Sequence, residues 1–121
     1  MQSVLIVDES IETRTALRTA LEHSGRQVFE AAGPDEGLRL AHRHHPSVIV
    51  LDLESDDSTT GSLAHEFQTA GMAPTPMLLL GTIKRRAQGF PCGEFISKPY
   101  HYAPLVRKIE KLLAQAQQPS R

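Results

Sequence analysis

Three short apolar segments of this chain each run directly into residues whose side chains suit a metal ion or a phosphoryl group. The first segment leads into Asp8 and Glu9, the second into Asp52, and the third into Lys98 and Pro99. If these segments are parallel strands of one sheet, their carboxyl ends lie at the edge where open α/β sheets bind ligands. Carboxylate oxygens suit a hard divalent cation, and an ammonium group suits a phosphoryl oxygen. The sequence therefore predicts one pocket that combines these groups.

The composition fits one globular domain. The chain has 121 residues, of which 40% are hydrophobic and 22% charged, and a formal net charge of -1. This charge gives no general attraction to nucleic acid or to anionic membranes, and the single cysteine excludes a disulfide framework. No segment approaches the ~20 apolar residues of a membrane span, and the N-terminus lacks a signal-peptide pattern. We therefore expect a cytoplasmic domain that binds neither membrane nor nucleic acid directly.

Strands and helices are predicted to alternate five times, at spacings too long for β-hairpins. The predicted strands cover residues 2–7, 27–31, 47–51, 76–80 and 95–97. The first two helices begin near Ser10 and Pro34 and end before Gly25 and Pro46, and three more cover residues 62–70, 82–88 and 103–115. This alternation is typical of an α/β fold with a doubly wound parallel sheet. The other predicted segments are a shortened fourth helix, a polar acidic loop over 53–61, and a polar tail over 117–121 that follows a domain of residues 1–116.

In this order and at these spacings, the acidic pair, Asp52 and the Lys98–Pro99 dipeptide resemble the receiver domains of response regulators in two-component signalling. The resemblance covers essentially the whole chain and implies a (βα)5 fold with the flavodoxin-like strand order 2-1-3-4-5. It implies a signalling module rather than a metabolic enzyme. Such a module takes a phosphoryl group from a histidine kinase or a phosphotransfer protein in a phosphorelay. It then switches its contacts with an output partner, which the sequence does not identify, and it can form a weak homodimer.

The resemblance also implies a role for each site residue. Asp52 becomes the phosphoacceptor, because a carboxylate can attack a phosphoryl group and form an acyl phosphate. Lys98 holds a phosphoryl oxygen and pairs with Asp52 before modification, and the bond between Lys98 and Pro99 is expected to be cis. The cofactor is Mg2+. Its implied ligands are Asp8, Glu9, Asp52 and the backbone carbonyl of Glu54.

Two positions depart from the family pattern. Gly81 stands where the family usually has a threonine or serine whose hydroxyl binds the phosphoryl group, and Thr82 follows it. Phe95 holds the position of the aromatic switch residue, without the hydroxyl of a tyrosine, and a plain core residue is the alternative interpretation. These departures support a second hypothesis, a degenerate receiver domain that acts as a phosphorylation-independent protein-interaction module. The retained acids and Lys98 favour the first hypothesis.

Other polar groups are interpreted mainly as solvated surface. They are the basic run over 84–86, the histidines His42, His44 and His45, and the acids Asp56 and Asp57. The histidines end a predicted helix, where the helix dipole favours them, and their spacing also leaves a metal site open. A flavin site on the same architecture is disfavoured, because acids follow the first strand in place of a glycine-rich phosphate loop.

Overall fold

Five parallel strands form one sheet in the order β2-β1-β3-β4-β5. This is the predicted flavodoxin-like order, which is confirmed. The computed structural model describes residues 2–55, 66–67, 75–82 and 94–116. The strands are β1 (Ser3–Val7), β2 (Gln27–Ala31), β3 (Val48–Asp52), β4 (Met77–Gly81) and β5 (Glu94–Ser97). The helices are α1 (Ile11–His23), α2 (Pro34–His44), the 3-10 turn η1 (Leu53–Ser55) and α5 (Tyr102–Ala116).

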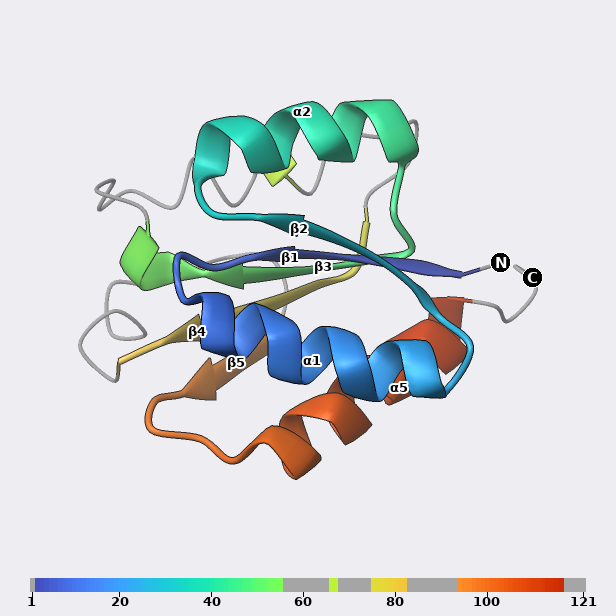
Figure 1. The fold of residues 1–121 in the computed structure, drawn as a ribbon, viewed down its shortest axis with the longest axis vertical. Helices are drawn as coiled ribbons and strands as arrows, with labels where there is room; N and C mark the ends of the chain where they lie inside the picture. The colour runs from blue at the N-terminus through green and yellow to red at the C-terminus, as the bar shows by residue number, and fades with distance from the viewer. Residues whose placement is uncertain (1, 56–65, 68–74, 83–93, 117–121) are drawn as a thin grey trace.

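The sheet lies between two layers of helix (Figure 1), with α1 and α5 on one face and α2 on the other. Because successive side chains of a strand point to opposite faces, β1 contributes to both layers. Val4 and Ile6 pack with α1 and α5, whereas Leu5 and Val7 pack in the cluster that includes α2. All residues of β1, β3 and β4 are buried, which the uninterrupted apolar segments predicted.

The start and end of α1 follow the predicted signals. Ser10 caps the helix, since its side chain accepts a hydrogen bond from the Thr13 N–H at 3.2 Å. The helix ends at the cap residue Ser24, and Gly25 adopts a left-handed φ of 83°. Both features confirm the prediction. They place the N-terminus of α1, and the turn before it, at the carboxyl edge of the sheet.

The segment after β3 differs from the predicted polar loop. Its first three residues form η1, and Leu53 is fully buried in the core on the α2 face of the sheet. The carboxylate of Asp52 accepts the N–H of Glu54 at 3.0 Å, which turns the chain immediately after the strand. The prediction of a polar loop was wrong for these residues, because Leu53, an apolar residue between Asp52 and Glu54, was assigned to the loop on the strength of its acidic neighbours. The predicted helices over 62–70 and 82–88 lie outside the described residues, apart from 66–67 and 82.

Among the described residues, no helix has the length and apolar character needed to cross a membrane.

Gly37 sets how closely α2 approaches the sheet. A Cβ atom at this position would meet Val7 Cγ2 at 2.8 Å and Phe67 Cζ at 3.0 Å. We expect Gly37→Ala to lower the free energy of unfolding by about 1 kcal/mol, because overpacking costs about 1–3 kcal/mol and the gain in helix propensity offsets part of it. Urea unfolding measures the effect. Gly33→Ala, which meets no atom within 4 Å, is the control with a smaller effect. A Gly37→Ala variant at least as stable as the parent chain would contradict this account.

Candidate functional site

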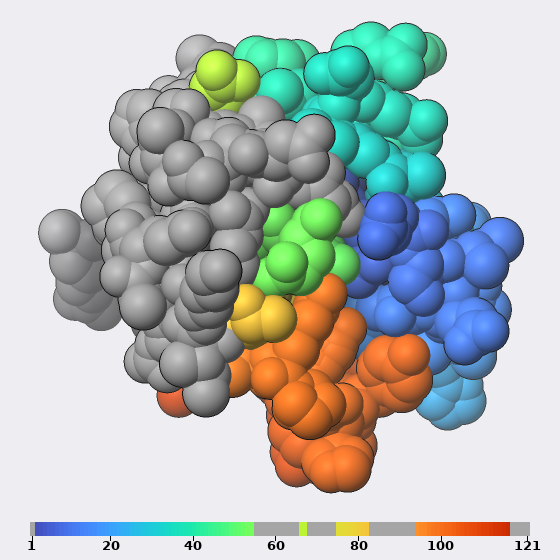
Figure 2. Space-filling model, turned by 90° about the vertical axis from the view of Figure 1, so that its left-hand side faces the viewer, coloured from blue at the N-terminus to red at the C-terminus, as the bar shows by residue number. Residues whose placement is uncertain are grey.

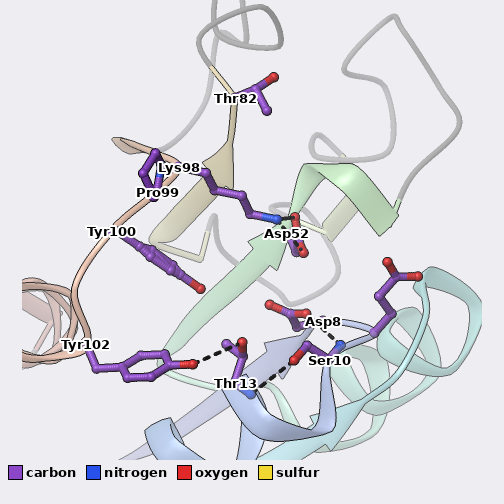
Figure 3. Close-up of a pocket in the computed structure, with 10 residues that line it drawn as sticks. Asp8, Ser10, Thr13, Asp52, Thr82, Lys98, Pro99, Tyr100 and Tyr102 are labelled. Carbon is purple, nitrogen blue, oxygen red and sulfur yellow. Dashed lines mark hydrogen bonds and ion pairs between the residues drawn. The ribbon is translucent and has the colours of Figure 1, made fainter.

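The carboxyl edge of the sheet holds a pocket built from four separate segments. In the space-filling view of this edge, the blue β1–α1 segment, the green end of β3, the yellow end of β4 and the orange segment after β5 meet around one hollow (Figure 2). Figure 3 shows its side chains. The residues that line it are Asp8, Glu9, Ser10, Thr13, Asp52, Thr82, Lys98, Pro99, Tyr100 and Tyr102. The three apolar segments identified in the sequence therefore do end at one pocket.

Lys98 and Asp52 form an ion pair at the centre of this pocket (Figure 3). The Lys98 ammonium donates to Oδ1 and Oδ2 of Asp52 at 2.8 and 2.9 Å. The Asp52 side chain is only 4% exposed, and Lys98 retains 29%. Because β4 lies between β3 and β5, the Lys98 side chain reaches across the end of β4, and its backbone N–H donates to the Gly81 carbonyl at 2.8 Å. The pairing and the cis Lys98–Pro99 bond that the resemblance implied are both present.

Asp8 is the second buried carboxylate of the pocket. Burial raises the pKa of Asp8 above its usual value of 3.8, and the nearby charge of Asp52 raises it further. The Ser10 N–H, which donates to Asp8 Oδ1 at 2.8 Å, and the charge of Lys98 act in the opposite direction. The pocket therefore holds two buried carboxylates and one ammonium group, and a bound cation would relieve the excess negative charge.

Glu9 and Glu54, the other two residues that supply implied metal ligands, are less buried than Asp8 and Asp52. Glu9 is exposed, and Glu54 Oε1 accepts the Thr82 N–H at 3.2 Å, a contact that sequence reasoning missed. Within the described ranges, no three His, Cys, Asp or Glu side chains lie close enough together to hold a metal. The structure thus brings Asp8, Asp52 and the exposed Glu9 to one pocket, with the two buried acids as its innermost carboxylates. This donor set still fits Mg2+, which usually keeps several waters and binds proteins through one or two carboxylates.

Tyr100 and Tyr102 form an aromatic side of the pocket that sequence reasoning also missed (Figure 3). Burial raises the pKa of the half-buried Tyr100 to about 12, and the charge of Asp8 contributes. The hydroxyl therefore keeps its proton at neutral pH and can donate a hydrogen bond. The Tyr102 hydroxyl lies 3.4 Å from Oγ1 of Thr13. The sequence feature that could have predicted their place in the pocket is their position in the chain, because both tyrosines follow Pro99 closely.

The expected switch residues occupy different places. Gly81 ends β4 and pairs with Ser97, so it contributes backbone and no hydroxyl to this edge. Thr82 lines the pocket. Phe95 is half-buried and packs in the core cluster on the α2 face of the sheet. The core interpretation of Phe95 therefore describes its place in this structure, and its role in a switch stays a prediction.

The histidines lie at the end of α2, outside the pocket. His42, His44 and His45 are exposed, as expected, but the ring of His44 also stacks on Phe29 with centroids 4.0 Å apart. His45 adopts a left-handed φ of 47° and caps the helix. The interpretation of His44 as solvated surface was therefore incomplete, because its ring also covers one face of the Phe29 ring. The acids at 56–57, the basic run at 84–86 and the cysteine at 92 lie outside the described residues.

Comparison with known proteins supports the resemblance that the sequence motifs indicate. No protein-family model matches the chain. It is 29% identical over 122 residues to the probable transcriptional regulator ycf27 of Cyanophora paradoxa, over 98% of this chain and 51% of that protein. It is 30% identical over 116 residues to the KDP operon transcriptional regulatory protein KdpE of Escherichia coli, over 93% of this chain and 52% of that protein. The structure of chemotaxis response regulator CheY4 of Vibrio cholerae matches with a TM-score of 0.72 and 26% identity, over 93% of this chain and 98% of that one.

The fold, the pocket and these likenesses define the class of protein. The chain belongs to the receiver domains of response regulators in two-component signalling. Such domains are signalling modules. The chain spans about half the length of the curated relatives just described.

Proposed function

We propose that this domain accepts a phosphoryl group on Asp52, with Mg2+ as cofactor, and thereby changes its contacts with an output partner. The donor is a histidine kinase or a phosphotransfer protein. The observation that carries the proposal is the ion pair, in which the Lys98 ammonium contacts both carboxylate oxygens of a buried Asp52. Asp8, the second buried carboxylate of the same pocket, supports a cation beside it.

The chemistry is a transfer between two nucleophiles. A carboxylate oxygen of Asp52 forms a bond to phosphorus while the bond from phosphorus to the donor breaks, and the donor leaves with that electron pair. In this proposal Lys98 would hold a phosphoryl oxygen once the Asp52 carboxylate has been converted to the acyl phosphate. When bound, Mg2+ supplies charge neutralisation between carboxylate and phosphoryl oxygens. The residues that would hold it are Asp8, Asp52, the Glu54 carbonyl and the exposed Glu9.

Incubation with acetyl phosphate and Mg2+ tests the proposal directly. We expect the intact protein to gain the mass of one phosphoryl group, and EDTA to prevent the gain. Absence of any incorporation would favour the second candidate, a phosphorylation-independent interaction module. Gly81 favours that candidate, because the end of β4 offers a phosphoryl group no side-chain hydroxyl.

A single cysteine supports a cytoplasmic location, since disulfides mark many small exported domains.

Glu9→Ala is expected to raise the Kd for Mg2+ about tenfold, because it removes the exposed carboxylate among the three that line the pocket. Intrinsic tyrosine fluorescence can follow the titration: the chain has no tryptophan, and its two tyrosines both line the pocket. His44→Ala removes a polar side chain from the end of α2 and is expected to leave the Kd unchanged. Equal effects of the two variants would place the metal elsewhere.

A further inference from the structure

The turn between β1 and α1, which carries Asp8 and Glu9, is tied to the neighbouring strand by a largely buried arginine. Arg14 of α1 donates through Nη1 to the backbone carbonyl of Asp8 at 2.7 Å. Its Nε donates to a carboxylate oxygen of Glu30 on β2 at 3.1 Å. The two side chains retain 14% and 22% exposure. One guanidinium group therefore joins the acidic turn, α1 and β2.

Arg14 completes a set of hydrogen bonds around Asp8. The Asp8 N–H donates to the Ala31 carbonyl at 3.0 Å, and its carboxylate accepts the Ser10 N–H at 2.8 Å. With the bond from Arg14, the N–H, the carbonyl and the carboxylate of Asp8 each have a partner. These contacts fix the direction in which the Asp8 carboxylate enters the pocket.

A guanidinium group beside a cation site also carries an electrostatic cost, because like charges repel. Glu30 offsets this cost. Its two carboxylate oxygens contact Arg14 and Arg18, and Arg18 contacts Glu22 at 3.1 Å. Two arginines and two glutamates thus form a network without net charge. The turn keeps its bond from Arg14 while the field of the guanidinium group is largely cancelled.

We propose that Arg14 is a positioning residue for the cation site and that Glu30 neutralises it, so that a divalent cation is not repelled. This inference rests on the proposed function, because it takes Asp8 to face Mg2+. Partners that orient metal ligands typically change the affinity about 10–100-fold when they are removed. Arg14→Met keeps most of the apolar stem and loses both polar contacts, so we expect its Kd for Mg2+ to rise about tenfold.

The chain offers a matched control for this experiment. Arg26 and Glu110 form an ion pair at 2.8 Å with side-chain exposures of 25% and 27%, and neither residue lines the pocket. Arg26→Met removes a comparable contact and is expected to lower stability to urea without changing the Kd for Mg2+. Arg14→Lys keeps the charge and one donor group, so its Kd should fall between those of the parent chain and Arg14→Met.

Glu30→Gln tests separately whether Glu30 neutralises the charge of Arg14. It also keeps the proposal testable if Arg14→Met does not fold. It leaves all Mg2+ ligands in place but leaves the Arg14 charge unbalanced. We expect the Kd to rise about threefold at low ionic strength and to return to the parent value near 1 M salt, where the Debye length is about 3 Å. Glu110→Gln is the control, with no change at either salt concentration.

The outcomes separate this inference from the proposed function. If the parent chain shows no Mg2+ binding in the tyrosine titration, both are overturned. If the parent chain binds Mg2+ and Arg14→Met binds it within twofold as tightly, the positioning role is wrong and the proposed function stands. An equal loss of affinity in Arg26→Met would show a general effect of destabilisation and would also overturn it. A salt-independent or absent effect of Glu30→Gln would remove the neutralising role.

Discussion

Asp52→Asn is expected to abolish the Mg2+-dependent gain of a phosphoryl group from acetyl phosphate. An amide has almost the shape of the carboxylate, but it lacks the charge and the nucleophilic oxygen that the transfer requires. The variant also loses the charge that Lys98 neutralises at 2.8 and 2.9 Å. Intact-mass measurement over time gives the result directly, and we expect no detectable modified species. Circular dichroism shows whether the variant keeps the fold.

Glu110→Gln is the control for this experiment, since it removes one carboxylate far from the pocket and should be modified like the parent chain. The stable modification of Asp52→Asn to the same extent as the parent would show that another carboxylate accepts the group. Asp8 would then be the first alternative, because it is the other buried acid that lines the pocket.

Asp8→Asn is expected to have opposite effects on stability and on metal binding. The pKa of Asp8 is raised by burial and by the charge of Asp52, so the fold disfavours its ionised form. The cost to stability is therefore present at neutral pH and disappears as the pH falls through the folded-state pKa. Without Mg2+, we expect the variant to be more stable to urea by about 1 kcal/mol at pH 7, and this advantage to shrink toward acidic pH.

Saturating Mg2+ should reverse that order, because only a chain that binds the ion tightly is stabilised by it. Two urea titrations, one with EDTA and one with excess Mg2+, make the comparison at each pH. An Asp8→Asn variant that is less stable than the parent in EDTA would show that the contacts of the carboxylate outweigh its burial. In that case the acid would serve the fold rather than the cation.

Much of this architecture could be predicted because its signals are local. Apolar segments with no polar interruption predict strands buried on both faces, and the observed β1, β3 and β4 are such strands. Ser10 and Gly25 marked the two ends of α1 for stereochemical reasons that act within a few residues. The convergence of Asp8, Asp52 and Lys98 followed from the parallel topology, since it aligns the carboxyl ends of the strands.

What the sequence did not reveal depends on contacts between distant segments. The contact of Glu54 with the Thr82 N–H joins residues 28 positions apart, and no local pattern marks it. Arg14 has an ordinary position in an amphipathic helix, and its bond to the Asp8 carbonyl follows from the turn that precedes the helix. Tyr100 lies between the last predicted strand and the last predicted helix and received no prediction, yet it packs against the core and lines the pocket.

The crossing of Lys98 over the end of β4 has a consequence for the order of events in folding. The ion pair closes a loop of 46 positions, and among the described strands β5 pairs with β4. Non-local pairing of this kind forms slowly, because the entropy of loop closure is lost before the contacts are gained. A chain that is still emerging from the ribosome can align β1 with β3, yet it holds no lysine opposite Asp52 until β5 has been synthesised and docked. Chemistry that needs both residues is therefore confined to chains in which β5 has docked.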